Sequence, residues 1–438
     1  MLSYKIILDN NSTCFSSEVD YVSRYIERCY LVKRTNSDKA DVIISYGKSM
    51  KCDSNIHLTP ELMEFALSVN NNGISLVDKK PVIHALKKCM AKNNEKYTTS
   101  STGVVCFKED LIALSFILLS RIEERSSLEL DQHERYSINN DIVFCAGLYG
   151  LPIVDMLIDE FIDIAFDGRV ARRLSYSIKI THDIDRLRSY HSIWKSTRSV
   201  LGDIVKRMNP TLALQRLRNE LNLLEPWSSQ KKLIDIYSKL GFRATFFVMG
   251  PSLYNMDSTY FLRMPKLLKS YIKLLLKNGH EIGLHPGYES FYNKSIYSEQ
   301  KQSVEELLEI KLTSARQHVL RFNIEQTPLI ASKCGIKSDF TLAYPELLGF
   351  RNGTTRGMNA FDFFNRKPID LLMYSTSIVD FTLHGGKYNT LSLEEASNMA
   401  NRMIYFCKKY DGKLVTLYHT GYMINRHFQF YRKILESI

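Results

Sequence analysis

The sequence predicts an α/β protein of two domains, residues 1–172 and 173–438, with parallel strands in the second domain arranged as a barrel. Short apolar runs alternate with amphipathic stretches across short links, a pattern typical of parallel strands joined by right-handed crossovers. A chain of 438 residues is also too long for one ordinary core. Gly168 and three nearby arginines place the boundary near residues 167–174.

The composition and the N-terminal sequence limit the classes of protein to which this chain can belong. Hydrophobic residues make up 45% of the chain and charged residues 24%, as in soluble globular proteins. The eight cysteines are scattered, which predicts reduced and mostly buried thiols. The N-terminus lacks a basic region leading into an apolar one, and the longest apolar run, Leu111–Leu119, falls short of the ~20 residues that span a bilayer. We therefore expect a cytoplasmic protein without a transmembrane segment.

Residues 1–172 are predicted to form a smaller α/β accessory domain. Its clearest helix is Glu109–Glu124, because Leu111, Leu114, Leu118 and Ile122 lie on one stripe. We find no metal-ligand constellation and no glycine-rich loop here, so the residues do not reveal a role. The other predicted elements are strands at Lys5–Leu8 and Val42–Ser45 and helices at Glu18–Tyr30, Pro60–Val69 and Leu151–Phe166.

The second domain is predicted to repeat strand and helix several times. Ala244–Met249 is almost entirely apolar, which is typical of a strand covered on both faces. Further extended segments are predicted at Glu281–Leu284, Ala315–Leu320 and Leu414–Tyr418, and helices at Lys231–Leu240, Phe261–Lys277, Ser298–Ile310, Thr327–Cys334 and Ser392–Tyr410.

The first strand of this domain carries the leading candidates for chemistry. Tyr176, Ile178 and Ile180 alternate as in a strand with one buried face. Asp183 and Asp185 are two positions apart, so their side chains project to the same side of an extended backbone. Two carboxylates this close usually share a metal or a proton. We interpret the pair as one metal ligand and one base. On these residues alone, an Asx turn that merely ends the strand explains them equally well.

Polar residues also close the later strands. His285 ends one strand, Arg316 and His318 end another, and His419 follows the last. Since the carboxyl ends of barrel strands meet at one mouth, these side chains are expected near the aspartate pair. One aspartate and two neutral imidazoles would leave an open position on a zinc-like ion, as hydrolytic metal sites require.

A basic segment follows the aspartate pair. Residues 186–232 contain ten lysines and arginines and three acidic residues, which supplies most of the net charge of +11. With apolar residues interleaved at roughly helical spacing, the segment could contact a membrane surface or phosphate groups, although a solvated helical face is the simpler explanation. No nucleic-acid motif is present, so we expect no nucleic-acid partner. The interleaved apolar residues are Ile193, Trp194, Val200, Leu201, Ile204 and Val205.

Three motifs carry a resemblance to a known family. Thr-His-Asp-Ile-Asp at 181–185, Ala-Thr-Phe-Phe-Val at 244–248 and Gly-His-Glu-Ile-Gly-Leu-His at 279–285 resemble the polysaccharide deacetylase family, carbohydrate esterase family 4, with its NodB-like domain. The resemblance covers roughly residues 175–425 and implies a distorted (β/α) barrel of about seven strands. The Asp-x-Asp form resembles a variant subgroup, since the family usually has adjacent aspartates.

The resemblance implies a role for several of these residues. Asp183 falls at the position of the catalytic base, Asp185 at a metal ligand, and His285 at the first histidine of a His-x-x-x-His pair. Position 289, where the second histidine belongs, is glutamate. Either Glu289 ligates through oxygen or His318 fills the vacancy from the neighbouring strand; His318 is favoured because it stands where the family has another site motif.

Two further roles and an upstream likeness complete the resemblance. His419, in Leu-Tyr-His-Thr, matches the late histidine that acts as general acid, and Arg316 would orient the base. Upstream, Leu118–Glu124 and Asp131–Arg135 resemble the N-terminal domain fused to a subgroup of these bacterial proteins.

The resulting functional hypothesis is a metal-dependent hydrolase. It would remove N-acetyl groups or, as a second choice, O-acetyl groups from a sugar of a surface glycan or its precursor. The expected cofactor is a divalent metal, zinc first, with cobalt, manganese or nickel as alternatives. Two other readings stay open: a hydrolase of non-sugar C–N bonds, and an inactive glycan-binding or scaffold protein of the same fold, which the glutamate at position 289 motivates.

Overall fold

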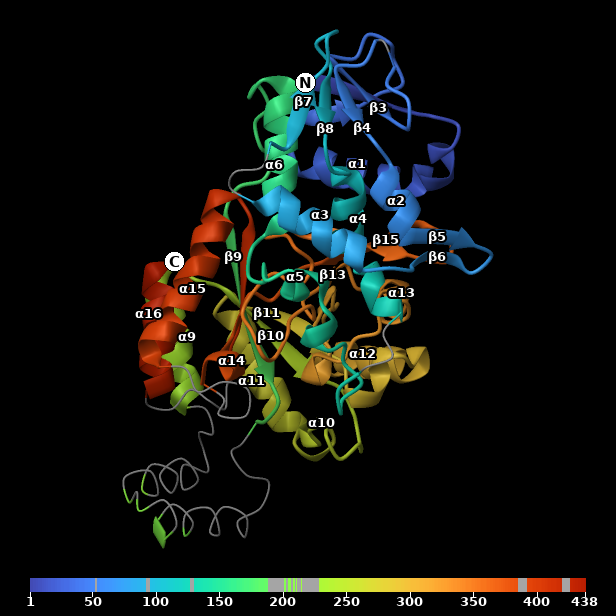
Figure 1. The fold of residues 1–438 in the computed structure, drawn as a ribbon. Helices are drawn as coiled ribbons and strands as arrows, with labels where there is room; N and C mark the ends of the chain where they lie inside the picture. Colours follow the sequence, from blue (N-terminus) through green and yellow to red (C-terminus); the bar gives the residue numbers. More distant parts are fainter. Residues whose placement is uncertain are drawn as a thin grey trace.

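The computed structural model describes most of the chain. The described residues are 1–187 except 52, 92–94 and 127–129, then 228–384, 392–419 and 426–438, together with positions 201, 204, 205, 208, 210 and 214. In Figure 1 the N-terminal part (residues 1–172, blue to green) lies at one end of the C-terminal part (173–438, green to red). The boundary at residue 172 stays a prediction, because one hydrophobic core runs through both parts.

A six-stranded sheet organises the N-terminal part. Its strands are β1 (Leu2–Leu8), β2 (Val32–Arg34), β3 (Val42–Tyr46), β4 (Ile56–Leu58), β7 (Tyr97–Thr99) and β8 (Val105–Phe107), and its helices are α1 (Ser16–Cys29), α2 (Glu61–Ala66), α3 (Lys80–Met90), α4 (Leu111–Ser120), α5 (Ile142–Cys145) and α6 (Ile153–Phe166). The strand order is β2-β1-β3-β4-β8-β7, and only the pair of β7 and β8 is antiparallel. Helix α4 is buried all round, as its almost wholly apolar sequence requires.

A nine-stranded sheet organises the C-terminal part. Its strands are β9 (Ser177–Ile184), β10 (Ala244–Met249), β11 (Glu281–His285), β12 (Ser314–Ala315), β13 (Ser338–Asp339), β14 (Met358–Asp362), β15 (Lys367–Met373), β16 (Ile378–Val379) and β17 (Lys413–Leu417). Its helices are α9 (Ser228–Leu240), α10 (Tyr260–Arg263), α11 (Pro265–Lys277), α12 (Lys294–Leu308), α13 (Thr327–Lys333), α14 (Asp380–His384), α15 (Leu393–Lys409) and α16 (Arg426–Ser437). The order is β14-β15-β13-β12-β11-β10-β9-β17-β16, parallel except between β14 and β15.

The expected distorted (β/α) barrel of about seven strands is matched in part: the sheet has nine strands, and its ladder does not close among the described residues. The ladder is an open row with β14 and β16 at its edges. Two backbone hydrogen bonds nevertheless link its two sides, because the segment after β15 reaches both. The amide of Thr376 donates to Leu342 beyond β13, and the amide of Ser377 donates to Val415 of β17. The mixed α/β class with parallel strands is confirmed; the seven-strand count is not.

Most predicted elements are present, with ends within four residues of the predicted ones. The helix predicted at Pro60–Val69 is wrong in its second half. Leu67–Asn70 is instead strand β5, paired antiparallel with β6 (Gly73–Leu76). A turn of asparagines ending in Gly73 allows this hairpin, since Gly73 has a φ of +90°, a conformation that side chains disfavour.

Two predicted elements of the C-terminal part are also corrected. The helix Phe261–Lys277 is split at Met264, and Pro265 begins the second helix because proline lacks the N–H that only a first-turn position can spare. The extended segment Ala315–Leu320 contains only the end of β12, followed by a single 3₁₀ turn at His318–Leu320. That turn changes the direction in which His318 points.

Buried charges join the two parts. Asp155 of α6 is fully buried and accepts four hydrogen bonds, from the hydroxyl of Tyr25, the hydroxyl of Thr354 and both the amide and the hydroxyl of Thr355. The guanidinium of Arg356 lies 3.8 Å from it. The carboxylate of Asp155, in the N-terminal part, therefore satisfies several buried donors. Most of these donors belong to the C-terminal part, and the guanidinium of Arg356 adds a positive charge.

We predict that Asp155→Ala lowers the free energy of unfolding by about 3–5 kcal/mol, because removing one partner leaves a buried charge and several donors uncompensated. Urea denaturation measures the change. Asp163→Ala, on the exposed face of the same helix, is the matched control and should stay within about 0.5 kcal/mol of wild type. Equal effects of the two substitutions would contradict the prediction.

The basic segment at residues 186–232 lies largely outside the described residues. Of its interleaved apolar residues, Leu201, Ile204 and Val205 are described, and all three are exposed. Its contact with a membrane surface or phosphate stays a prediction. Across the described residues, no helix combines the length and the apolar character needed to cross a membrane.

Candidate metal centre

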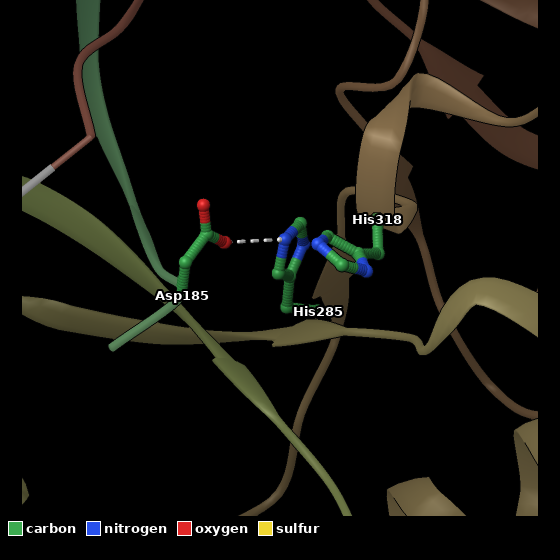
Figure 2. Close-up of side chains that lie close together, drawn as sticks. All are labelled: Asp185, His285 and His318. Carbon is green, nitrogen blue, oxygen red and sulfur yellow. Dashed lines mark ion pairs between the residues drawn. The ribbon is translucent and has the colours of Figure 1, made fainter. Parts of the chain in front are cut away.

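Three side chains converge at the carboxyl ends of the central strands. One ligand atom from each of Asp185, His285 and His318 lies within 4.8 Å of the others. Figure 2 shows the ring of His285 between the carboxylate of Asp185 and the ring of His318. The two rings meet edge to face, with centroids 5.1 Å apart. No other group of this kind is found among the described residues.

The strands explain this convergence. Asp185 directly follows β9, His285 is the last residue of β11, and His318 lies three residues beyond β12. These strands run parallel within one sheet, with β10 between β9 and β11, so their carboxyl ends meet at one edge. Asp183 lies on the same side of β9 as Asp185, as the spacing of two predicts.

Hydrogen bonds fix the tautomer of both histidines. Nδ1 of His285 donates to the carbonyl of Arg316 at 2.6 Å, and Nδ1 of His318 donates to Oδ1 of Asp257 at 2.7 Å. These oxygens only accept, so the protons sit on Nδ1 and the neutral rings carry a lone pair on Nε2. Metal-binding histidines are commonly held in this way by an oxygen behind the ring.

Two buried atoms at the centre favour a cation between them. Oδ1 of Asp185 and Nε2 of His285 lie 3.4 Å apart and make no hydrogen bond within the described residues. That separation suits two ligands of a tetrahedral ion with bonds of roughly 2.0–2.2 Å. Burial would raise the pKa of Asp185, but the contact with His285 and the charges that the nearby histidines carry when protonated hold it far below its usual value. The donor set fits zinc, with a fourth position for water or substrate.

Asp183 is held on one side and faces the cluster on the other. Its Oδ1 accepts a hydrogen bond of 3.0 Å from Nη1 of Arg316, a fully buried side chain. The rest of that guanidinium donates to the carbonyl of Phe340 and the hydroxyl of Thr376. Oδ2 of Asp183 lies 3.9 Å from Nε2 of His285. The carboxylate is thus oriented with one oxygen toward the metal ligands.

His419 lies opposite, backed by its own carboxylate. Its Nδ1 donates to Oδ1 of Asp380 at 2.8 Å, and its amide donates to Oδ2 at 2.6 Å. Its Nε2 lies 3.7 Å from Asp185 and 4.0 Å from Asp183. Burial would lower the pKa of His419, but the charge and hydrogen bond of Asp380, with the other two carboxylates, raise it to about 10. The ring therefore holds a proton at neutral pH.

The structure brings all six candidate residues together and separates Glu289 from them. Glu289 accepts from the hydroxyl of Tyr292, lies 3.9 Å from Arg321 and is not part of the cluster. Of the two alternatives for the third ligand, the geometry supports His318.

Two residues of the site were missed from the sequence, Asp257 and Asp380. Asp380 directly follows β16, so its strand-end position was a usable signal, but a two-residue strand shows no alternation. Asp257 lies in the loop between β10 and α10, where a single aspartate carries no pattern.

We predict that Asp257→Ala weakens zinc binding about 10- to 100-fold, because the ring of His318 loses the acceptor that fixes its tautomer and direction. Titration calorimetry measures the affinity. Ser252→Ala is the matched control, since its hydroxyl donates 2.7 Å to the same carboxylate but does not touch the histidine. The prediction fails if both variants bind zinc as wild type does.

Metal binding should also depend on pH. Burial would lower the pKa of His285, but the charges of Asp183 and Asp185 outweigh burial and raise it. A raised pKa means that the ring keeps its proton to higher pH, and a metal must displace that proton. Zinc affinity should therefore fall as pH falls below this pKa, about tenfold per unit for one displaced proton. Calorimetry from pH 5.5 to pH 8 in two buffers counts the protons released; no release would contradict the prediction.

Comparisons with known proteins give limited likenesses. A family of unknown function (DUF7033) matches residues 7–165, which is less than half of the chain. Among the curated proteins no match is found.

Solved structures match this chain weakly. A proposed polysaccharide deacetylase from Mycobacterium smegmatis is 15% identical, with 61% of this chain and 85% of that chain covered and a TM-score of 0.39. A family 4 carbohydrate esterase from Streptomyces lividans, in complex with acetate, is 12% identical, with 60% and 88% covered and a TM-score of 0.30. An allantoinase is 10% identical, with 60% and 84% covered and a TM-score of 0.38. At these values the likenesses assign neither a family nor an activity.

Proposed function

We propose that this chain is a metal-dependent hydrolase that removes N-acetyl groups, or as a second choice O-acetyl groups, from a sugar of a surface glycan or its precursor. The observation that carries the proposal is the cluster of Asp185, His285 and His318, in which two buried ligand atoms have no hydrogen bond to any described residue. The sugar substrate rests on the resemblance of the three sequence motifs to polysaccharide deacetylases.

Asp183 is the proposed base. When bound, a divalent cation supplies Lewis acidity, which polarises a carbonyl and makes water easier to deprotonate. Asp183 faces the ligands through Oδ2 and takes the proton of the attacking water there. Arg316 holds Oδ1 and keeps the carboxylate turned toward the site. Its fixed, buried guanidinium costs no reorganisation during the reaction.

His419 is the proposed acid. The departing amine of an amide needs a proton before it can leave, and the Nε2 of His419 faces the same space as Asp183. Asp380 fixes the ring by accepting from Nδ1, which leaves Nε2 to donate. The base and the acid thus approach the reacting carbonyl from two different strands, β9 and β17. The products would be an amino sugar and acetate.

The proposal includes a cellular setting. A cytoplasmic enzyme would act on a nucleotide- or lipid-linked precursor, and the basic segment at residues 186–232 could contact the phosphate of such a precursor or a membrane surface. The glutamate at position 289 motivated the interpretation as an inactive protein. That argument is weaker because His318 lies close enough to Asp185 and His285 to serve as a third ligand.

Acetate release tests the function. The zinc-reconstituted protein should release acetate from N-acetylglucosamine oligosaccharides or from UDP-N-acetylglucosamine, and chelation of the zinc should stop the release. An O-acetylated sugar separates the ester activity, and allantoin tests the hydrolysis of non-sugar C–N bonds. Zinc-loaded protein that releases no acetate from any acetylated sugar would overturn the proposal, and turnover of allantoin alone would replace it.

A further inference from the structure

A segment of the N-terminal part reaches the proposed metal centre. Residues 130–136, here called the strap, follow helix α4 and run onto the turn that carries His318. In Figure 1 this stretch belongs to the teal chain that descends from the N-terminal part beside α12. The strap folds back on itself, since Leu130 and Tyr136 form a β-bridge.

The turn that carries His318 has an unusual backbone. Val319 has a φ of 59° and Leu320 a φ of 57°, both in the left-handed region. Residues with a branched or bulky side chain rarely adopt this conformation, and it persists only where the surroundings impose it. The position of His318 therefore depends on what holds the residues directly after it.

The strap supplies that hold. Nη1 of Arg135 donates to the carbonyl of Val319 at 3.1 Å. Nε of Arg321 donates to the carbonyl of His133 at 2.9 Å, and its Nη2 pairs with Glu134. The left-handed pair is thus tied to the strap at Val319 and at Arg321, the residue after the pair.

The strap is itself ordered by one carboxylate. Asp131 accepts from the guanidinium of Arg135 at 2.6 and 2.7 Å and from the amides of His133 and Arg135 at 2.7 and 3.0 Å. Arg135 is almost fully buried. Its guanidinium is therefore held in a fixed place against the turn.

The same contacts extend to the loop after His285. Arg321 donates to the carbonyl of Tyr288 at 2.7 Å and stacks over that ring at 3.8 Å. The amide of Tyr288 donates to Asp257, which also holds the ring of His318. His318 is thus held through its ring by Asp257, and the backbone directly after it is held by the strap through the carbonyl of Val319.

We infer that the strap is a positioning element that completes the metal centre by fixing the turn of His318, with Arg135 as its central positioning residue. The inference rests on the proposed function, because it needs a metal at this site. It gives the N-terminal part a role in the same chemistry, so that residues 1–172 and the C-terminal part form one functional unit.

Cobalt binding by the full chain tests the inference. Co²⁺ serves as the probe because its visible absorption reports ligand geometry as well as affinity. Arg135→Ala should weaken Co²⁺ binding about 10- to 100-fold and change the spectrum, as loss of support behind a metal ligand does. Arg125→Ala is the matched control, since Arg125 also joins the two parts, through Glu325 and the ring of Phe363, and makes no contact with the turn among the described residues. It should bind Co²⁺ as wild type does.

Two further variants keep the test decisive. Arg135→Lys retains the charge beside Asp131 but has a shorter reach, so its affinity should lie between those of Arg135→Ala and wild type even if the alanine variant folds poorly. Val319→Gly, placed in the Arg135→Ala background, should restore part of the affinity, because glycine adopts the left-handed conformation without a hold.

Four outcomes separate the inference from the proposed function. Wild-type affinity and spectrum in a folded Arg135→Ala variant would overturn the role of the strap. An equal loss in Arg125→Ala, or no gain from Val319→Gly, would also overturn it, because the effect would then be a general loss of stability. Absence of Co²⁺ binding by wild type would instead overturn the metal site itself.

Discussion

Asp183→Asn is expected to lower acetate release by about 10²- to 10⁴-fold while the protein keeps its metal, since general base catalysis typically contributes this much. The amide cannot accept the proton that the carboxylate takes. It can still accept the hydrogen bond from Arg316 through its carbonyl oxygen, so the geometry of the site should survive. Asp183 does not belong to the three-ligand cluster, which is why metal content should not change.

The measurement pairs turnover with elemental analysis of the same sample. Asp110→Asn is the matched control: it replaces another buried carboxylate, at the start of α4, where asparagine caps a helix equally well. Its turnover should equal that of wild type. If Asp183→Asn keeps more than a tenth of wild-type turnover at full metal occupancy, Asp183 is not the base.

His419→Ala is expected to lower kcat on an N-acetyl sugar by about 10²- to 10⁴-fold, the usual contribution of a general acid. The loss should nearly vanish with p-nitrophenyl acetate, because nitrophenolate leaves without needing a proton. Steady-state kinetics on the two substrates measures the difference. An equal loss on both would mean that His419 holds the structure or the metal and does not protonate the leaving group.

Asp380→Asn tests the same role through pH. Asp380 raises the pKa of His419 by its charge and hydrogen bond, so the amide variant should have a lower pKa at this ring. A general acid works only while protonated, and activity is lost as pH rises through its pKa. The alkaline limb of the pH–rate profile should therefore move to lower pH in the variant. An unmoved limb would contradict the assignment of His419 as the acid.

Site residues could be predicted from the sequence where a residue type suited to catalysis or metal binding stands at the end of a recognisable strand. Asp183 lies near the end of an alternating strand and Asp185 directly follows it, and their spacing of two places both on one side of the extended backbone. His285 and His419 end or follow strands in the same way. His318 was harder to predict, because its strand is two residues long and a turn redirects it. His318 became a candidate because it stands where the resembled family has another site motif.

The supporting contacts could not be predicted, for a physical reason. Asp257 and Asp380 act through hydrogen bonds to residues 61 and 39 positions away, and no local pattern records such pairs. The strap lies in a stretch without regular periodicity and matters only because the fold brings it to Val319. The buried Asp155 is likewise one polar residue within an apolar helix until its partners are known.

The fold likewise has features that the sequence predicts and features that it does not. The near-continuous apolar run of β10 gives the predicted strand at the correct residues, because a strand buried on both faces leaves a strong signal. Whether the sheet closes depends on contacts of the segment after β15 with two distant strands, which no local pattern encodes. The helix predicted at Pro60–Val69 failed because a hairpin turn overrides helical spacing within a few residues.

Metal content tests the central claim most directly. Elemental analysis of wild type after reconstitution with zinc should find near one equivalent of metal, and Glu289→Ala should retain it. His318→Ala should lose it, because two remaining ligands hold zinc poorly. Wild type without metal, or a Glu289→Ala variant that loses the metal while His318→Ala keeps it, would contradict the site described here.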